Sequence, residues 1–259
     1  MNLAVTGLTT RALFAGAVVL LWGGTLAAQP AADLARITDP EMDRVAESVG
    51  SSDTERRVIK RRLGGWKELT ASARNRGLAE PEKLRLVNDF MLETPFFCDP
   101  VLWCMEDFWA KPVEFLANDG GDCEDFSIAK YFTLRALGVP EERLRIVYAV
   151  YQRGTFTGAH MVLAYYPTPD AEPLILDNIN PSVLPASNRP DLVPVFSFNS
   201  QGLWGAKEQK GRAQPTDAYR AWGDHWRRVQ TEAAIRTVSP EQRKGSECQA
   251  LIQRSVWCR

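Results

Sequence analysis

The sequence GGDCEDFSIAKYFTLRALG, residues 120–138, places a cysteine where a glycine-containing loop becomes an amphipathic helix. A helix N-terminus carries partial positive charge and free backbone N–H groups, and both stabilise a thiolate. We therefore predict that Cys123 is a nucleophile. Gly138 and Pro140 predict the end of the helix, because glycine favours the conformation of a helix C-terminus and proline cannot continue a helix.

The apolar pattern changes from helical to strand-like after this helix. Residues 144–151, 160–166 and 173–177 are rich in β-forming side chains and are bounded by turn residues, and 195–198 is a candidate fourth strand. Short connections favour antiparallel pairing of neighbouring strands. Together with the preceding helix, this pattern predicts an α+β fold.

A base and an orienting acid for the thiol are available on these strands. The chain has only two histidines; His160 opens one predicted strand and Asp177 closes the next. Taken singly, a strand histidine is often structural and an aspartate at a strand end is often a turn former. With Cys123 they make a nucleophile, base and orienting group. Asn178 is the alternative orienting residue, and His225, among tryptophans, is predicted to be structural.

Acidic residues surround the cysteine, and two interpretations stand side by side. Asp122, Glu124 and Asp125 can cap the helix and complement its dipole. As bare charges, however, they would raise the pKa of the thiol, whereas a calcium ion, which takes six to eight oxygen ligands, would neutralise them. Glu106 and Asp107 are further candidate ligands. Zinc is not expected, since structural zinc prefers cysteine and histidine.

Composition and the N-terminus indicate an exported globular protein. The 259 residues are 45% hydrophobic with a net charge of −1, which gives no reason to expect nucleic-acid binding. Arg11 precedes an apolar run, 12–22, and small residues follow, the order of a secretory signal. The run is short for a spanning helix of ~20 residues, although an uncleaved anchor is the alternative. We predict a periplasmic protein.

The five cysteines fit an oxidising compartment. Spacing predicts two small disulfide loops, Cys98–Cys104 and Cys248–Cys258. Cys123 is then unpaired, which in an exported protein indicates a reactive thiol. The alternative is five unrelated cysteines, some of them buried and reduced.

The predicted organisation has five parts: a signal peptide (1–28), a linker leading into the first helices (29–53), an N-terminal helical part (54–93), a catalytic core (94–210) and a C-terminal helical extension (211–259). The helical pattern of 54–76 is interrupted by Gly64-Gly65 and contains eight arginines and lysines. This basic stretch is either a solvated helix face or a docking face for an anionic membrane or an acidic partner. Within the core, 94–112 is predicted to be irregular and aromatic.

Several segments resemble one family. They are residues 121–126, 129–131, 134–139, 159–166, 172–178, 185–192 and 196–199, with Trp204. Over about 88–204 the chain resembles the bacterial transglutaminase-like cysteine peptidases, and among them the LapG-type periplasmic adhesin proteases. The resemblance implies a papain-like, transglutaminase-core fold. In that fold the helix bearing the cysteine packs on an antiparallel β-sheet, with extra N- and C-terminal helices.

The resemblance also implies a function and a site. It assigns Cys123, His160 and Asp177 as the catalytic triad, and calcium dependence to Asp122 and Glu124, with Asp125 as a third ligand. It implies cleavage of a large surface adhesin near its N-terminus at an Ala-Ala type site, which controls biofilm attachment. An inner-membrane cyclic di-GMP receptor would sequester the protease. The alternatives are a transglutaminase-like acyl transferase and a non-catalytic binding protein of the same fold. The four cysteines predicted to pair depart from the family pattern.

Overall fold

The computed structural model describes residues 36–206, 208, 218–232 and 234–255, so the predicted signal peptide and Cys258 lie outside the described residues. The helices are α1 (Asp39–Val49), α2 (Asp53–Asn75), α3 (Glu80–Leu92), α4 (Asp99–Trp103), α5 (Pro112–Ala117), α6 (Cys123–Ala136), α8 (Arg220–Thr231), α9 (Pro240–Lys244) and α10 (Ser246–Arg254). The strands are β1 (Leu144–Arg153), β2 (Phe156–Tyr165), β3 (Leu174–Leu176), β4 (Leu184–Pro185), β5 (Leu192–Phe198) and β6 (Leu203–Gly205). The prediction of an α+β fold is confirmed.

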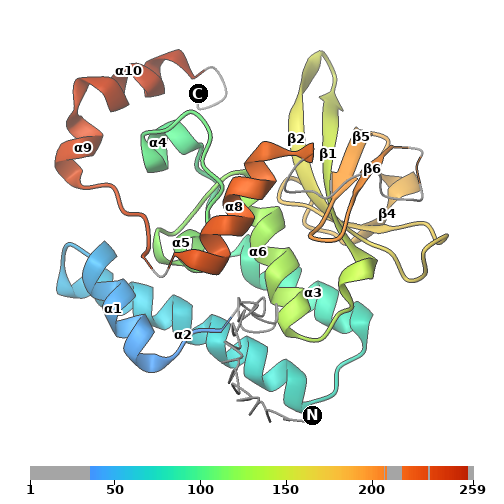
Figure 1. Cartoon of the computed structure of the whole chain (residues 1–259), viewed down its shortest axis with the longest axis horizontal. Helices are drawn as coiled ribbons and strands as arrows, with labels where there is room; N and C mark the ends of the chain where they lie inside the picture. The colour runs from blue at the N-terminus through green and yellow to red at the C-terminus, as the bar shows by residue number, and fades with distance from the viewer. Residues whose placement is uncertain (1–35, 207, 209–217, 233, 256–259) are drawn as a thin grey trace, which may run out of the picture.

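The strands form one antiparallel sheet in the order β4-β3-β2-β1-β5-β6 (Figure 1). Its central hairpin pairs β1 with β2 from Leu144 opposite Tyr165 to Arg153 opposite Phe156. Only two residues connect the strands, and Gly154 has φ +62°, a conformation that glycine adopts without strain. The predicted turn at 153–158 is therefore shorter than expected, and β2 begins four residues before His160.

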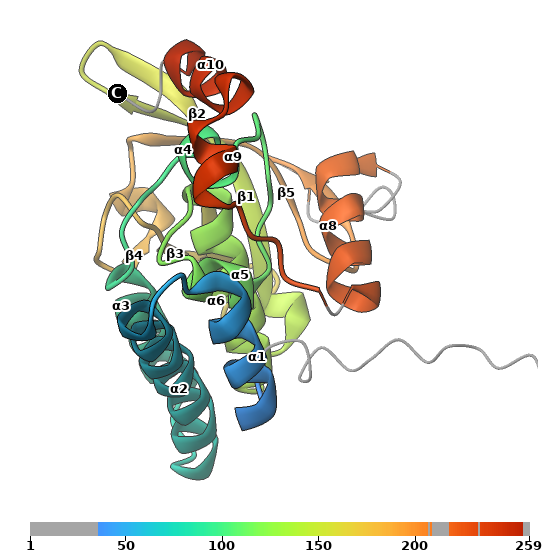
Figure 2. The ribbon, with the colours of Figure 1, turned by 90° about the vertical axis from the view of Figure 1, so that its left-hand side faces the viewer.

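The helix that carries the cysteine packs on this sheet, as Figures 1 and 2 show. Alternate residues of the hairpin, such as Ile146 and Leu163, join the main core with α6. Their neighbours Val147 and Val162 belong to a second, smaller cluster, as expected for side chains that alternate between the faces of a sheet. α3 and α5 also contact α6, so buried structure surrounds the helix that carries Cys123.

The glycine pair does not interrupt α2, which is continuous over 23 residues. A Cβ at Gly65 would lie 3.5 Å from the Phe90 ring of α3, and one at Gly64 would lie 3.9 Å from the Met42 sulfur of α1. Tertiary packing on both sides thus outweighs the low helix propensity of glycine. No helix in the described ranges is long and apolar enough to cross a bilayer.

Several basic side chains of α2 form ion pairs with acidic residues of the same chain. Lys60 and Lys67 form ion pairs with acids of α1, at 2.7 Å from Asp43 and 2.6 Å from Asp39. Arg62 pairs with Asp119 at 2.7 Å and donates to the Leu116 carbonyl at 2.7 Å. These contacts hold α1 and the core against α2, and they support neither docking alternative.

The predicted disulfide between Cys98 and Cys104 is wrong. These residues are the N-cap and C-cap of α4, and a helical rise of ~1.5 Å per residue places them ~9 Å apart along the axis. This exceeds the roughly 7 Å limit for the Cα separation in a disulfide. Instead Cys104 is bonded to Cys248 of α10, with a Cα–Cα distance of 4.7 Å. The predicted Cys248–Cys258 pair is therefore also wrong, and Cys98 is itself disulfide-bonded.

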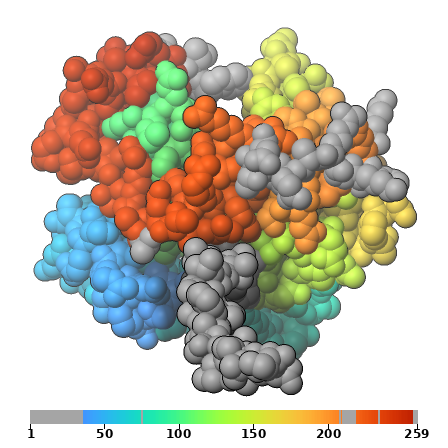
Figure 3. Space-filling view, viewed as in Figure 1, coloured from blue at the N-terminus to red at the C-terminus, as the bar shows by residue number. Residues whose placement is uncertain are grey.

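The segment predicted to be irregular, 94–112, contains α4, and α5 begins at its last residue. The C-terminal helix predicted over 216–234 is α8, and two further short helices follow it. α10 contacts α4, and Figure 3 shows the C-terminal segment next to α4 on one face of the molecule. The disulfide thus fastens the C-terminal helices to the loop region that precedes Cys123.

Candidate active site

Cys123 is the first residue of α6, and the loop before it is fixed by backbone contacts. Phe97 N–H donates to the Gly121 carbonyl at 2.9 Å, and Phe96 forms a parallel bridge with Gly121. A Cβ at Gly121 would lie 2.3 Å from a carboxylate oxygen of Asp125, so only glycine allows this approach. The loop therefore presents the thiol at a helix N-terminus, where no N–H of the first turn has a partner within the helix.

His160 and Asp177 are brought together by neighbouring strands. His160 lies in β2, Asp177 directly follows β3, and the two side chains are buried. Nε2 of His160 lies 2.7 Å from Oδ1 of Asp177. Because a carboxylate only accepts, Nε2 carries the proton and donates it, which leaves Nδ1 as the basic nitrogen.

The sulfur of Cys123 lies against the strand that carries His160. β3 pairs with β2 only over Leu163–Tyr165, so the edge of β2 near His160 is not covered by β3. The backbone N–H of Met161, the next residue, lies near enough to the thiol to lower its pKa. The thiol of Cys123 therefore lies near the residue that follows His160 in β2.

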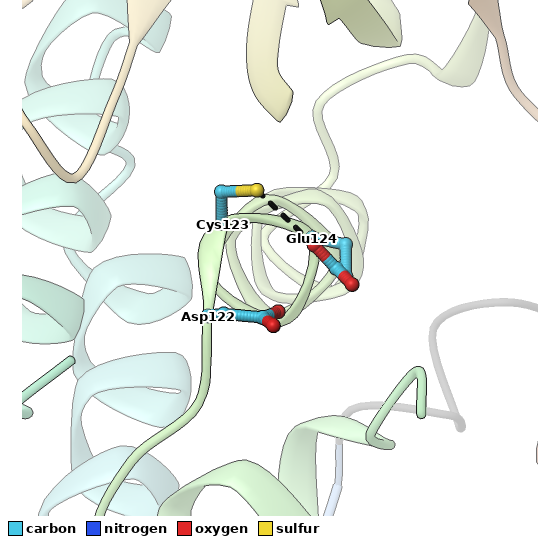
Figure 4. A group of neighbouring side chains, drawn as sticks. All are labelled: Asp122, Cys123 and Glu124. Carbon is cyan, nitrogen blue, oxygen red and sulfur yellow. Dashed lines mark hydrogen bonds between the residues drawn. The ribbon is translucent and has the colours of Figure 1, made fainter. Parts of the chain in front are cut away.

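The acids next to Cys123 work against a thiolate. In Figure 4, Asp122, Cys123 and Glu124 project from the start of α6, and a hydrogen bond joins the Cys123 sulfur to Glu124. That contact measures 3.1 Å. Burial and then the charges of Glu124 and Asp122 raise the pKa of Cys123 well above its usual value, although the Met161 N–H opposes this. Without a compensating cation, the thiol is protonated at neutral pH.

The predicted ligands belong to a larger acidic cluster. Carboxylate oxygens of Asp99, Asp122 and Asp125 lie within 4.8 Å of one another, and so do those of Asp99, Asp107 and Glu124. Burial, followed by the charge of Glu124, raises the pKa of Asp99 to about 8. Burial likewise raises the pKa values of Asp122, Glu124 and Asp125. So many carboxylates in one buried place require either protons or a cation.

Helix capping and the helix dipole explain these acids only in part, since Glu124 and Asp125 lie in the first turn of α6. Asp122 occupies the N-cap position, but its side chain makes no capping hydrogen bond. One carboxylate oxygen in each of Asp99, Asp122 and Asp125 is buried with no hydrogen-bond partner among the described residues. The second oxygens of Asp99 and Asp125 accept backbone N–H groups of Phe108 and Ala110, at 2.5 and 2.6 Å. Hard, buried, unpartnered oxygens at one place are the donor set that fits Ca²⁺.

Sequence reasoning found only part of this cluster. Asp107 was a candidate, whereas Glu106 belongs to no such group in the described part of the chain. Asp99 was missed; it begins a short helix within a segment predicted to be irregular, so no periodic pattern marked it. His225 is buried against the Trp109 carbonyl, to which Nδ1–H donates at 2.9 Å. That contact agrees with a structural role.

Two basic residues at Asp177 were also missed. Arg189 donates from Nη2 to Oδ2 of Asp177 at 2.6 Å, and Lys130 donates from Nζ to its backbone carbonyl at 2.9 Å. Burial by itself raises the pKa of the Asp177 carboxyl. The hydrogen bond and charge of His160, the Ile179 N–H and Arg189 together lower it below its usual range. Asp177 is therefore ionised at neutral pH.

Comparison with known proteins places this site in a family. Residues 78–204 match the bacterial transglutaminase-like cysteine proteinases, BTLCP. A structure of Legionella pneumophila LapG is 40% identical, covers 75% of this chain and 98% of its own, and superposes with a TM-score of 0.61. The EGTA-treated form of that protein gives 40% identity over the same shares of the two chains and a TM-score of 0.63.

The calcium-bound form of Legionella pneumophila LapG is 35% identical, covers 84% of this chain and 99% of its own, and has a TM-score of 0.56. No curated protein sequence matches the chain. Identity of this level over nearly the whole of the related chains agrees with the arrangement of helix, sheet and free thiol described above. The chain belongs to the bacterial transglutaminase-like cysteine proteinases and is a cysteine protease of the LapG type.

Proposed function

We propose that the chain is a calcium-dependent periplasmic cysteine endopeptidase that cleaves a large cell-surface adhesin near its N-terminus, at an Ala-Ala type site, and thereby controls biofilm attachment. In this proposal Cys123 is the nucleophile, His160 the general base and Asp177 the orienting acid. The observation that carries it is the 2.7 Å hydrogen bond between His160 and Asp177, in a chain of the cysteine proteinase family that also has a thiol at a helix N-terminus.

The chemistry follows from which nitrogen is basic. Nδ1 of His160 takes the proton of the Cys123 thiol, and the sulfur attacks a peptide carbonyl carbon. The backbone N–H of Cys123 donates to the oxyanion that forms. The imidazolium then returns its proton to the leaving amine, and a thioester remains. His160 next takes a proton from water, the hydroxide attacks the thioester, and the carboxylic acid and the free thiol are released.

The acidic cluster supports the calcium dependence. Asp99, Asp107, Asp122, Glu124 and Asp125 would hold the ion, and the unpartnered oxygens of Asp99, Asp122 and Asp125 fit a hard cation. Bound calcium would supply positive charge that offsets the carboxylates and lowers the pKa of the neighbouring thiol. The calcium-bound form of the Legionella relative supports calcium as the ion.

Other features of the chain support the proposed localisation, substrate and partner. The charged, apolar and small-residue order of residues 1–28 supports export. The Cys104–Cys248 disulfide supports an oxidising compartment such as the periplasm. Family likeness supports an adhesin as substrate and an inner-membrane cyclic di-GMP receptor as the partner that sequesters the protease.

The decisive experiment incubates the purified mature chain with N-terminal fragments of exported adhesins, with calcium or with EGTA. We expect one cut in calcium, none in EGTA and none with Cys123→Ala. Mass spectrometry of the products separates hydrolysis from acyl transfer, because a transferase would give a cross-linked or amine-modified fragment. Cleavage by Cys123→Ala at the wild-type rate would refute the mechanism.

A further inference from the structure

We propose that Arg189 is a positioning residue that holds the Asp177 carboxylate in the orientation in which it accepts the proton of His160 Nε2. The inference rests on the proposed triad and adds a fourth member to it. Arg189 follows the short helical turn 186–188 that lies between β4 and β5, and the sequence patterns considered above gave it no role.

The hydrogen bonds to Asp177 divide between its two oxygens. Oδ1 accepts His160 Nε2 at 2.7 Å and the backbone N–H groups of Asn178 and Ile179 at 2.6 and 3.1 Å. Oδ2 accepts Arg189 Nη2 at 2.6 Å. With both oxygens bound, rotation of the carboxylate would break a charge-assisted hydrogen bond in a buried place. Arg189, together with these two backbone N–H groups, therefore fixes which oxygen faces the imidazole.

Arg189 is itself held in one geometry. Asp191 accepts from Nε at 2.9 Å and from Nη2 at 2.7 Å, a two-point contact that defines the plane of the guanidinium. The Arg189 N–H donates to the Ala186 carbonyl at 3.0 Å, and the Leu192 N–H donates to the Arg189 carbonyl at 3.1 Å. Arg189 is only 3% exposed. Its position is thus set by the chain around it and does not depend on substrate.

The charges that face Asp177 come from three directions. His160 faces it from β2, Arg189 from the segment before β5, and Lys130 from α6, with Asp191 behind the arginine. Lys130 touches only the backbone carbonyl, and burial lowers its pKa to about 7. A guanidinium stays charged at every working pH. Arg189 is therefore the constant cation at this carboxylate.

A purely structural role would have a different signature. An arginine that only supported the fold would lower the melting temperature and the yield of folded enzyme. It would leave the ring of His160 and the turnover of the folded molecules unchanged. A positioning role predicts a loss of kcat with little change in KM, because Arg189 acts through Asp177 on the base and not on substrate binding.

The first measurement needs no substrate. Proton spectra of the ¹⁵N-histidine-labelled full chain would be recorded, in which only the rings of His160 and His225 give labelled signals. In the wild type, the Nε2 proton of His160 should give a far-downfield signal, as expected for a hydrogen bond to a carboxylate, and His160→Gln identifies it. The signal should disappear or move upfield in Arg189→Gln, persist in Arg189→Lys, and move less in Asp191→Asn.

The second measurement uses an adhesin fragment that the wild type cleaves. Arg189→Gln should lower kcat about 10- to 100-fold with KM within about threefold, the scale expected for a misplaced catalytic group. Arg189→Lys should recover part of the loss. The matched control is Arg135→Gln, which breaks another shielded ion pair, Arg135 to Glu141 at 2.5 Å, whose side chains are 13% and 10% exposed. It should lower stability but not kcat.

The outcomes separate this inference from the proposed function. If Cys123→Ala abolishes cleavage while folded Arg189→Gln keeps the wild-type kcat and histidine signal, only the role of Arg189 is refuted. An equal loss of kcat in Arg135→Gln would also refute it. If Cys123→Ala still cleaves, the triad is wrong whatever the spectra show. Should Arg189→Gln fail to fold, Arg189→Lys and Asp191→Asn carry the test, and unchanged kcat and signal in both would overturn the proposal.

Discussion

His160 and Asp177 share a 2.7 Å hydrogen bond although 17 positions separate them in the sequence. The antiparallel pairing of β2 with β3 makes this possible, because Asp177 directly follows β3 and so lies beside the part of β2 that carries His160. Since Nε2 is engaged, Nδ1 is the only basic nitrogen of the ring. The tautomer that a cysteine protease needs is thus set by sheet pairing, before any substrate binds.

Replacement of Asp177 tests this relationship directly. Asp177→Ala should lower kcat about 10²- to 10⁴-fold, because the imidazole loses both its orientation and the charge that stabilises its protonated form. Asp177→Asn should lose less, since an amide oxygen can still accept from Nε2–H. Steady-state cleavage kinetics on folded protein measure both. The matched control, Asp170→Ala at an exposed aspartate, should match the wild type. Equal kinetics for Asp177→Ala and the control would contradict the assignment.

Calcium should stabilise the folded protein as well as activate its protease activity. A ligand that binds only the folded state at 100 times its Kd adds about 2.7 kcal/mol to the free energy of unfolding. We expect the melting temperature to rise with added Ca²⁺ and to fall in EGTA. Asp99→Asn should remove most of this response, because Asp99 contributes to both groups of carboxylates. Asp119→Asn, three residues before Asp122 and paired with Arg62, should keep it. A melting temperature indifferent to calcium would speak against the site.

His225 predicts a pH dependence of stability. Burial lowers the pKa of His225 to about 3 in the folded state, against ~6.5 in an unfolded chain. Between these values the unfolded state binds a proton that the folded state does not. Stability should therefore fall as pH drops from about 6.5 towards 3, by at most ~1.4 kcal/mol per pH unit from this residue.

A phenylalanine at position 225 provides the comparison. His225→Phe keeps a ring in the aromatic cluster around Trp222, and it loses the hydrogen bond to the Trp109 carbonyl. It should be less stable than the wild type at pH 7, and its free energy of unfolding should fall less steeply below pH 6.5. Chemical denaturation at a series of pH values measures the slope. Parallel curves for the two proteins would exclude His225 as the source.

The Cys104–Cys248 disulfide should stabilise the folded protein by about 2–5 kcal/mol. The double variant Cys104→Ala/Cys248→Ala should lose this amount, and limited proteolysis should release the C-terminal helices first. Reduction of the wild type should lower stability at least as much, because it also breaks the disulfide of Cys98, while Cys123→Ala should keep the stability of the intact disulfide. If the double variant resists unfolding and proteolysis as the wild type does, the link between α4 and α10 contributes little.

The sequence predicted the elements that have a strong period or a clear stop signal. The helix after Cys123 ended at its glycine and proline, and the strands around His160 and Asp177 were found from their apolar runs. Where tertiary packing opposes local preference, the prediction failed. Gly64 and Gly65 were expected to interrupt a helix, because sequence does not show that α1 and α3 pack against them.

Contacts between distant segments account for the other errors. Cysteine spacing favoured small loops, whereas the bond from Cys104 spans 144 positions. Asp99 and Arg189 lie outside every periodic pattern, and only the fold brings them to the residues around Cys123 and Asp177. A triad could be predicted from the sequence because few histidines competed for the role of base. Asp99 and Arg189 could not be singled out, because aspartates and arginines are numerous.

The five-residue helix α4 has consequences for how the enzyme matures. Its first residue, Asp99, belongs to the acidic cluster, and the residue that ends it, Cys104, is tethered to Cys248. During translation, Cys123 and the acidic residues around it are made long before Cys248, the second cysteine of the disulfide. A chain that ended before residue 248 would contain Cys123 and the acidic cluster. It would lack the disulfide that holds α4, the helix that Asp99 begins. The C-terminus must therefore be made before the disulfide can hold α4 and, through Asp99, the acidic cluster at the start of α6.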